Sequence, residues 1–238
     1  MSILQIRQLN KRYRLDDISV PALTDIQLDI QPNRFTVLSG PSGSGKTTLL
    51  NLIGALDRPT SGEIILNGQP LSRLNDDQLA DFRARQIGFI FQNFNLLPVL
   101  SAYENVEYPL ILAKVPPQVR RNRVMELLAA VGLADKAQHR PGQLSGGQRQ
   151  RVAIARALAT NAQWILADEP TANLDQATGA AIIALMRQMQ RDLQVSFIFS
   201  SHDPQVLAAA DEAVFIRDGR IVESRNLASQ THPERAYA

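Results

Sequence analysis

The stretch Gly40-Pro41-Ser42-Gly43-Ser44-Gly45-Lys46-Thr47 follows the short apolar run 35–39 and precedes a helix-like segment that stops at Gly54. It matches the phosphate-loop pattern G-x-x-x-x-G-K-[ST], in which glycines let successive backbone N–H groups point at a phosphate. The following helix adds its positive N-terminal dipole. The pattern predicts an α/β nucleotide-binding domain, with Lys46 on the β- and γ-phosphates and the Thr47 hydroxyl on Mg²⁺. We expect ATP to contact Gly40, Pro41, Ser42, Gly43, Ser44, Gly45, Lys46, Thr47 and Thr48.

Two acidic residues, Asp168 and Glu169, follow the apolar run Trp164-Ile165-Leu166-Ala167. A buried strand that ends in two acids projects carboxylates from the sheet edge where ligands bind in open α/β folds. We expect Asp168 to hold Mg²⁺, mainly through its water shell, and Glu169 to polarise the attacking water. Two acids at a strand end are also compatible with a solvated turn, and the upstream phosphate loop favours the catalytic interpretation.

A second anion-binding segment is predicted at Leu144-Ser145-Gly146-Gly147-Gln148, which precedes a helix with apolar spacing. Serine, two glycines and a helix N-terminus form a nest of N–H groups that has no lysine. We find one phosphate-loop pattern in the chain, so the natural ligand of this nest is the ATP of another copy. The sequence therefore predicts a head-to-tail homodimer with nucleotide between the copies, bound in part by Ser145, Gly146, Gly147 and Gln148.

Composition limits the other functions. The 238 residues carry 25 basic and 23 acidic side chains that are interspersed along the chain, so nucleic acid is not expected as a partner. The absence of cysteine excludes disulfides and thiol catalysis. No stretch approaches the ~20 apolar residues of a membrane helix, so any membrane span is expected in another chain.

The pattern along the chain predicts one α/β domain over residues 1–238. Strand-like alternation fills the first forty residues and predicts strands there, which we expect to form an antiparallel β subdomain. Residues 93 to about 160 have helical spacing and predict an inserted helical subdomain. Asp218-Gly219 between residues 213–216 and 220–222 predicts a hairpin, and we expect the polar residues 223–238 to be loosely held.

The motifs together resemble those of the ABC (ATP-binding cassette) ATPases, and the resemblance covers nearly the whole chain. The segments 40–47, 165–169 and 144–148 resemble the Walker A, Walker B and signature motifs. Gln92 sits where the family has its Q-loop glutamine, Ala172-Asn173-Leu174-Asp175 resembles the D-loop, and His202 resembles the switch histidine. All six occur in the family's order. The resemblance implies a P-loop NTPase (RecA-like) core with the two subdomains described above.

The resemblance also gives roles to single residues. Tyr13 matches the aromatic residue that stacks on adenine, although a tyrosine near a strand end is also explained by amphipathic packing. His202 would hydrogen-bond the γ-phosphate, and Gln92 would contact Mg²⁺ or water while its loop meets a membrane partner. Taken alone, each could be an ordinary surface residue. Asp175 is expected near the nucleotide as part of the D-loop.

Residues 88–106, GFIFQNFNLLPVLSAYENV, resemble a narrower group: the ATPases of macrolide exporters, lipoprotein-releasing complexes and the FtsE-type system. Thr47, the pair Asn33-Arg34 and Ala172 depart from the commoner family residues without affecting a catalytic role. The resemblance implies a peripheral ATPase at the cytoplasmic face of the inner membrane. It would drive export, extraction or mechanical transmission through a separate integral-membrane permease. An importer ATPase and a soluble ABC ATPase are the alternatives.

The apolar cluster after Gln92 allows two interpretations. Its members could belong to the core, or they could form a patch that docks against a partner helix. The cluster consists of Phe94, Leu96, Leu97, Val99 and Leu100.

Overall fold

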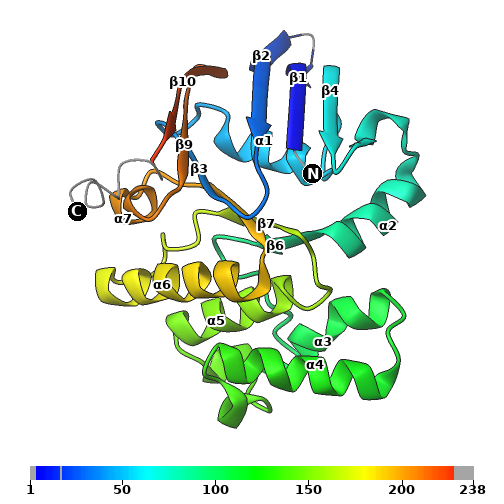
Figure 1. Ribbon diagram of the computed structural model, residues 1–238, viewed down its shortest axis with the longest axis vertical. Helices are drawn as coiled ribbons and strands as arrows, with labels where there is room; N and C mark the ends of the chain where they lie inside the picture. The colour runs from blue at the N-terminus through cyan, green and yellow to red at the C-terminus, as the bar shows by residue number, and fades with distance from the viewer. Residues whose placement is uncertain (1–3, 17, 228–238) are drawn as a thin grey trace, which may run out of the picture. The chain divides into compact units, whose positions relative to one another are not determined.

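The computed structural model describes residues 4–16 and 18–227, which fall into two compact units (Figure 1). The first unit contains the chain up to Leu74 and from Ser196 onward. The second unit is Asn75–Val195. The phosphate loop belongs to the first unit, and both the acidic pair and the signature segment belong to the second.

An antiparallel sheet forms the N-terminal part of the first unit, in the order β2-β1-β4-β5. These strands are β1 (Leu4–Leu15), β2 (Ile18–Ile30), β4 (Ser61–Leu66) and β5 (Gln69–Pro70). Alternate side chains of β1 and β2, among them Ile6 and Ile26, are fully buried, as the period of two requires. The predicted antiparallel subdomain is therefore confirmed.

The first unit also contains β3 (Phe35–Ser39), which leads into the phosphate loop. The strands beside it are β8 (Ser196–Ser200) and β9 (Glu212–Arg217), and β10 (Arg220–Asn226) lies beside β9. β3 pairs in parallel with β8 and with β9, and β9 pairs antiparallel with β10. β3 is buried from Phe35 to Leu38. Strands of parallel sheets are usually covered on both faces, which explains why this strand is largely one apolar run. Helices α1 (Lys46–Ile53) and α7 (Pro204–Ala208) complete this unit.

The hairpin at Asp218-Gly219 is confirmed, with both residues at positive φ as a two-residue turn requires. β10 continues to Asn226, so the prediction of a loosely held segment from residue 223 is wrong for its first residues. Backbone pairing with β9 holds the polar residues Glu223 to Asn226, after a register shift between Ile221 and Glu223. Of the remainder, residues 228–238 lie outside the described residues.

The second unit contains the parallel pair β6 (Ile87–Ile90) and β7 (Trp164–Asp168), preceded by α2 (Asp76–Gln86) and followed by α6 (Gln176–Leu193). The segment between β6 and β7 forms α3 (Ala102–Leu112), α4 (Pro117–Ala130) and α5 (Gly146–Ala157), with short 3₁₀ turns at Ala134–Lys136 and Pro141–Gln143. Helices occur here as the spacing predicts, while the limits of a separate helical subdomain stay a prediction.

Local signals explain where these helices begin and end. Ser101 and Glu104 form a capping box at the start of α3, with each side chain accepting a backbone N–H of the other residue. Pro117 opens α4, where its missing N–H costs nothing. Gly132, at a φ of 72°, follows the end of that helix.

None of the helices among residues 4–16 and 18–227 is long and apolar enough to cross a membrane.

Candidate nucleotide-binding and catalytic site

Both ends of the phosphate loop require glycine because other backbone segments approach them closely. A Cβ atom at Gly40 would lie 2.1 Å from the main-chain oxygen of Ile216 in β9. A Cβ atom at Gly45 would lie 2.9 Å from the main-chain oxygen of Ala22 in β2, at a φ of 104°. The glycines that the phosphate-loop pattern demands are thus also the residues that let the loop fit between two strands.

Lys46 is buried, and its ammonium is fixed at the loop. Its Nζ donates to the main-chain oxygens of Gly40, at 2.8 Å, and of Pro41, at 3.0 Å. The side chain of Ser44 in the same loop is buried, and its hydroxyl has no hydrogen-bond partner in the described part of the chain. A fixed cation, an unsatisfied hydroxyl and a helix start without a side-chain cap suit the phosphates of a nucleotide.

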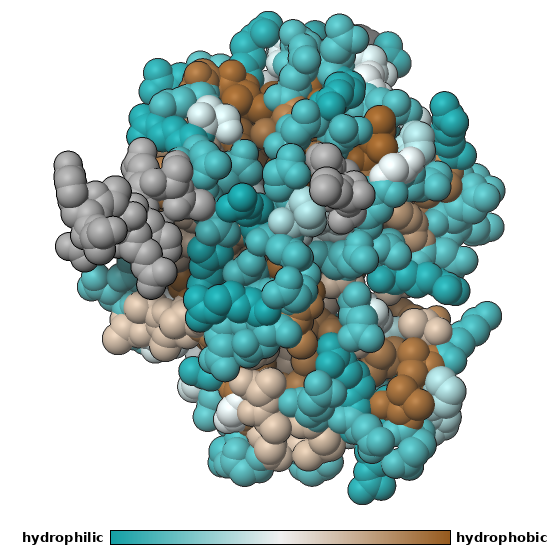
Figure 2. All heavy atoms as spheres, viewed as in Figure 1, coloured by the Kyte–Doolittle hydropathy of each residue, from teal (hydrophilic) through white to brown (hydrophobic). Residues whose placement is uncertain are grey.

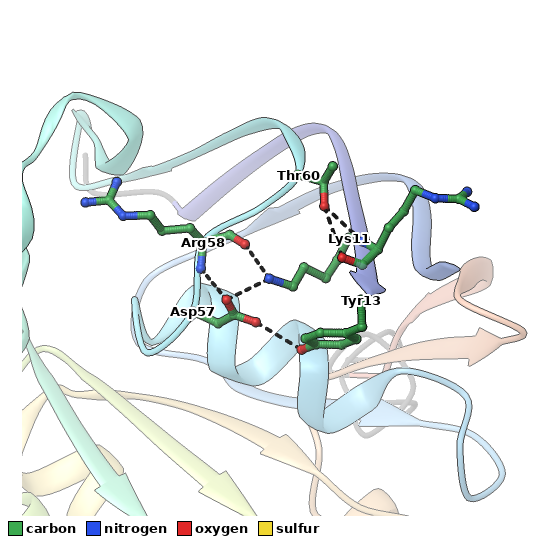
Figure 3. A network of polar contacts seen from close by, with 6 residues as sticks. Lys11, Tyr13, Asp57, Arg58 and Thr60 are labelled. Carbon is green, nitrogen blue, oxygen red and sulfur yellow. Dashed lines mark hydrogen bonds and ion pairs between the residues drawn. The ribbon is translucent and has the colours of Figure 1, made fainter. Parts of the chain in front are cut away.

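The predicted ligands Thr47 and Thr48 occupy the first turn of α1, directly after Lys46. Tyr13 of β1 lies near α1, since its phenol hydrogen-bonds Asp57 in the loop that follows this helix. The phenol donates to Oδ2 of Asp57 at 3.0 Å, and the ring is 40% exposed (Figure 3). Burial, followed by the hydrogen bond with Asp57, raises the pKa of Tyr13. The structure therefore brings the predicted adenine-stacking residue to the helix that carries the phosphate loop.

His202 lies at the same edge of the first unit as the phosphate loop. β3 and β8 are parallel with Leu38 opposite Ser200, so Gly40 and His202 each follow two residues later. The backbone N–H of Ser201 donates to the oxygen of Leu38 at 3.1 Å, which continues the pairing to the residue before His202. The imidazole side chain is exposed at this edge.

Gln92 and the acidic pair share an edge of the second unit for the same reason. β6 and β7 are parallel with Ile90 opposite Ala167, which places Gln92 and Glu169 at matching positions beyond the strands. Glu169 has a φ of 43°, a left-handed conformation that costs a non-glycine residue about 1–3 kcal/mol. Such strain is typical of functional positions, where the backbone turns to direct a side chain.

The loop after Gln92 is held by three polar side chains from different elements. The sequence pattern indicates Asn173 only as part of the D-loop and gives no role to Arg156 or Asn105. Asn173 donates to the main-chain oxygen of Gln92 at 3.0 Å and to Oδ1 of Asn93 at 2.9 Å. Arg156 of α5 donates to the main-chain oxygens of Phe94 and Asn95, both at positive φ.

The third of these side chains is Asn105 of α3, which is buried and hydrogen-bonds the backbone of Leu97, Leu100 and Ser101. The apolar cluster after Gln92, for which the sequence allowed both a core and a docking interpretation, contains both buried and exposed members. Phe94 is buried, whereas Val99 is 72% exposed.

The signature segment forms the start of α5, with Ser145 as its N-cap. Ser145 Oγ accepts from the backbone N–H of Gln148, and the Gln148 side chain accepts from the N–H of Ser145. The side chain of Gln148 is thus part of the helix cap. Gly146 and Gly147 occupy the first turn, so their N–H groups lie at the positive end of the helix dipole.

Asp175, expected near the nucleotide, caps α6. Its carboxylate accepts from the backbone N–H and from the hydroxyl of Thr178, at 3.0 and 2.6 Å. These hydrogen bonds lower the pKa of Asp175. The spacing Asp-x-x-Thr before a helix was a readable signal for this cap. A contact of Asp175 with nucleotide stays a prediction.

A metal site made only of protein ligands is absent from the described residues, in which no three His, Cys, Asp or Glu side chains cluster. Mg²⁺ is usually held by one or two protein oxygens together with substrate phosphates and water. The Thr47 hydroxyl in the first turn of α1 and the Asp168 carboxylate at the end of β7 are oxygen donors of the suitable kind.

Comparison with known proteins agrees with these features. The ABC transporter family model matches residues 23–172. An ABC transporter ATP-binding protein of Thermotoga maritima is 47% identical over 219 residues, which cover 92% of this chain and 93% of that protein. The macrolide export ATP-binding/permease protein MacB of Syntrophobacter fumaroxidans is 48% identical over 223 residues. This chain spans 31% of the length of that MacB protein.

Solved structures show the same fold. The dimeric, post-hydrolysis ATP-binding cassette MJ0796 bound to ADP and Pi is 40% identical, with a TM-score of 0.86 over 94% of this chain and 98% of that chain. A second dimeric structure of MJ0796 is 41% identical, with a TM-score of 0.85. The predicted fold class is thereby confirmed. With its family model, close relatives and phosphate loop in agreement, the chain belongs to the ABC transporter family, as an ATP-binding component that hydrolyses ATP.

Proposed function

We propose that two copies of this chain close head-to-tail around two ATP molecules and that the cycle of closure and hydrolysis drives an export permease. The supporting observation is the start of α5, where exposed Ser145 and two glycines offer donors for an anion in a chain with one phosphate-loop pattern. The relative MJ0796 is dimeric in its solved structures, and MacB is a macrolide export protein.

In the proposed cycle, the loop at 40–47 binds the triphosphate and Tyr13 stacks on the adenine. Ser145 and Gly147 of the second copy donate to the γ-phosphate and so make dimer affinity depend on ATP. Lys46 stabilises the charge that develops on the transferred phosphoryl group. Thr47, Gln92 and Asp168 would hold Mg²⁺, directly or through water, and the ion would neutralise phosphate charge when bound.

Glu169 is the proposed general base that polarises the attacking water, and His202 orients that water through the γ-phosphate. Release of phosphate would remove the groups that the second copy's Ser145 binds. The pair then opens, and this change is passed to the membrane partner. Because each site needs residues of both copies, hydrolysis should depend on protein concentration.

Replacing Glu169 by glutamine tests both parts of this function. Glu169→Gln should bind ATP, accumulate as a dimer with ATP and Mg²⁺, and lose ~10³-fold in turnover, about 4 kcal/mol of barrier. Glu126→Gln on the exposed face of α4 is the matched control and should turn over like the parent. Near-parental turnover of Glu169→Gln would overturn the assigned base. A monomer in saturating ATP would overturn the shared site.

A groove in the second unit suits the membrane partner. Its cavity of about 230 Å³ opens between β6, α3 and α5 and is lined mainly by apolar side chains, among them Phe89, Phe91, Pro109 and Leu112, with Arg156 at one side. The rings of Phe89 and Phe91 stack 5.7 Å apart. On the neighbouring face of α3, Tyr108, Ile111 and Leu112 are exposed, and Figure 2 shows brown side chains over this region. We place a helix of the permease in this groove, beside the loop that carries Gln92.

The lack of cysteine in the chain allows a direct test by cross-linking. Leu112→Cys at the groove should cross-link to an integral-membrane protein when the chain is expressed in its native host. Val222→Cys on β10 is similarly exposed, at 60% against 61%, and should not. Equal cross-linking at both positions, or cross-linking at Leu112→Cys to water-soluble proteins alone, would contradict this docking site. The proposed location is the cytoplasmic face of the inner membrane, and a cross-link to an integral-membrane protein would support the membrane association.

A further inference from the structure

A compact polar network surrounds the tyrosine that is proposed to stack on adenine (Figure 3). Asp57, in the loop after α1, accepts from the Tyr13 phenol at 3.0 Å through Oδ2 and from Lys11 Nζ at 2.7 Å through Oδ1. The backbone N–H of Arg58 also donates to Oδ1, at 2.7 Å. One carboxylate therefore ties two side chains of β1 to the loop that leaves the phosphate-loop helix.

Lys11 is fixed as firmly as Asp57. Its ammonium also donates to the main-chain oxygen of Arg58 at 2.8 Å and lies over the Tyr13 ring, 4.8 Å from the centroid. The Lys11 side chain is only 11% exposed, so the ion pair is shielded from solvent more than an ordinary surface pair. Hydrogen bonds from Lys11, Arg58 and Tyr13 outweigh the effect of burial and lower the pKa of Asp57, so it is a carboxylate at neutral pH.

These contacts restrict movement of the Tyr13 side chain in two ways. The phenol hydrogen bond fixes the tip of the side chain, and the ammonium covers one face of the ring. Tyr13 is nevertheless 40% exposed, so apolar packing alone does not hold its side chain. An aromatic side chain that is ordered before its ligand arrives loses less conformational freedom on binding.

We propose that Asp57 and Lys11 are positioning residues that hold the Tyr13 ring ready to stack on the base of the nucleotide, with the base on the face that Lys11 leaves open. This inference rests on the proposed role of Tyr13. It predicts that the network contributes to recognition of the base and makes little difference to recognition of the phosphates. Lys11 also balances the charge of Asp57, so that an anionic nucleotide does not meet an uncompensated carboxylate.

Binding of ATP and of inorganic tripolyphosphate, which has no base, separates positioning from general support of the fold. Dissociation constants of both ligands are measured by calorimetry on the full chain without Mg²⁺, so that ATP is not hydrolysed during the titration. Asp57→Ala should weaken ATP binding about three- to tenfold, the effect of freeing one ordered side chain, and leave tripolyphosphate binding within about twofold. Asp29→Ala, which removes the exposed Arg7–Asp29 ion pair of the same sheet, is the control and should change neither ligand.

Combining Asp57→Ala with a substitution of Tyr13 tests whether Asp57 affects ATP binding through the Tyr13 side chain. Tyr13→Phe lacks the hydroxyl, so adding Asp57→Ala to it should weaken ATP binding less than in the parent. Equal weakening of ATP and tripolyphosphate by Asp57→Ala, or no effect on ATP, would overturn the inference. A Tyr13→Ala chain that binds ATP like the parent would instead overturn the stacking role of Tyr13 in the proposed function. A thermal unfolding scan of each variant confirms that it is folded.

Discussion

Gly147 and Thr178 approach each other so closely that a Cβ atom on the glycine would lie 2.6 Å from Cγ2 of the threonine. Thr178 is held in place because its hydroxyl donates to Asp175 at 2.6 Å. The second glycine of the signature segment is therefore needed for packing of α5 against the first turn of α6, in addition to any role in binding phosphate. The contact links the signature segment to the D-loop within one chain.

We expect Gly147→Ala to lower the free energy of unfolding by about 1–3 kcal/mol, because the added methyl group overpacks this contact. Thr178→Ser removes Cγ2 and keeps the hydroxyl, so it should restore most of that loss in the double variant. Gly142→Ala is the control, since its Cβ would meet no atom within 4 Å. The free energy of unfolding is measured with denaturant for the parent, Gly147→Ala, the double variant and Gly142→Ala. Failure of Thr178→Ser to restore stability would show that this contact is not the cause.

The hydrogen bond from Asn173 to the main-chain oxygen of Gln92 should affect turnover. Asn173→Ala removes this hydrogen bond and the one to Asn93. The Gln92 side chain is then held less well in the position proposed for contact with Mg²⁺ or water. We expect kcat to fall about three- to tenfold with KM for ATP within twofold, the effect of one or two modest hydrogen bonds. Asn122→Ala on the surface of α4 should change neither constant. An unchanged kcat in Asn173→Ala would contradict a positioning role.

Mixed dimers test whether each nucleotide site is shared. Lys46→Ala chains keep an intact signature segment, and Ser145→Arg chains keep an intact phosphate loop. Each variant alone should be inactive. An equal mixture should recover roughly a quarter of wild-type activity, because half the dimers are mixed and each of these has one intact site. A mixture as inactive as its components, at concentrations where the parent is dimeric, would count against complementation between copies.

Burial raises the pKa of Glu212 in β9, against the opposing effects of Arg34, Ser224 and Thr36. A raised pKa in the folded state favours the protonated form, so stability is greatest below the ordinary value of 4.5 and is lost as pH rises through the folded-state value. Glu212→Gln should therefore raise the melting temperature at pH 7, and this gain should shrink toward pH 4.

Glu223→Gln on β10 is the control for this pH dependence. The hydrogen bond with Arg225 lowers the pKa of Glu223, so this substitution should give no gain at pH 7. The melting temperatures of the parent and both variants are measured at pH 7 and at pH 4. A gain for Glu212→Gln that is larger at pH 4 than at pH 7 would contradict the assigned cause.

Local sequence predicted most of the fold. The strand before the phosphate loop, the helix after it, the acidic strand end and the hairpin at Asp218-Gly219 all depend on residues within a few positions of one another. The prediction that the polar residues from 223 onward are loosely held was wrong for residues 223–226, which belong to β10. Pairing with β9 depends on a backbone edge, which polar side chains do not prevent.

The sequence by itself determined where the phosphate loop, the acidic strand end and the helix caps lie, because glycine spacing, paired acids and capping residues act through local backbone geometry. Only the tertiary structure decided what holds those residues. Tyr13 meets Asp57 44 positions away, and Asn173 meets Gln92 81 positions away. No local pattern encodes such contacts. They arise when packed strands and helices bring distant loops together, and side-chain hydrogen bonds then fix the loops in place.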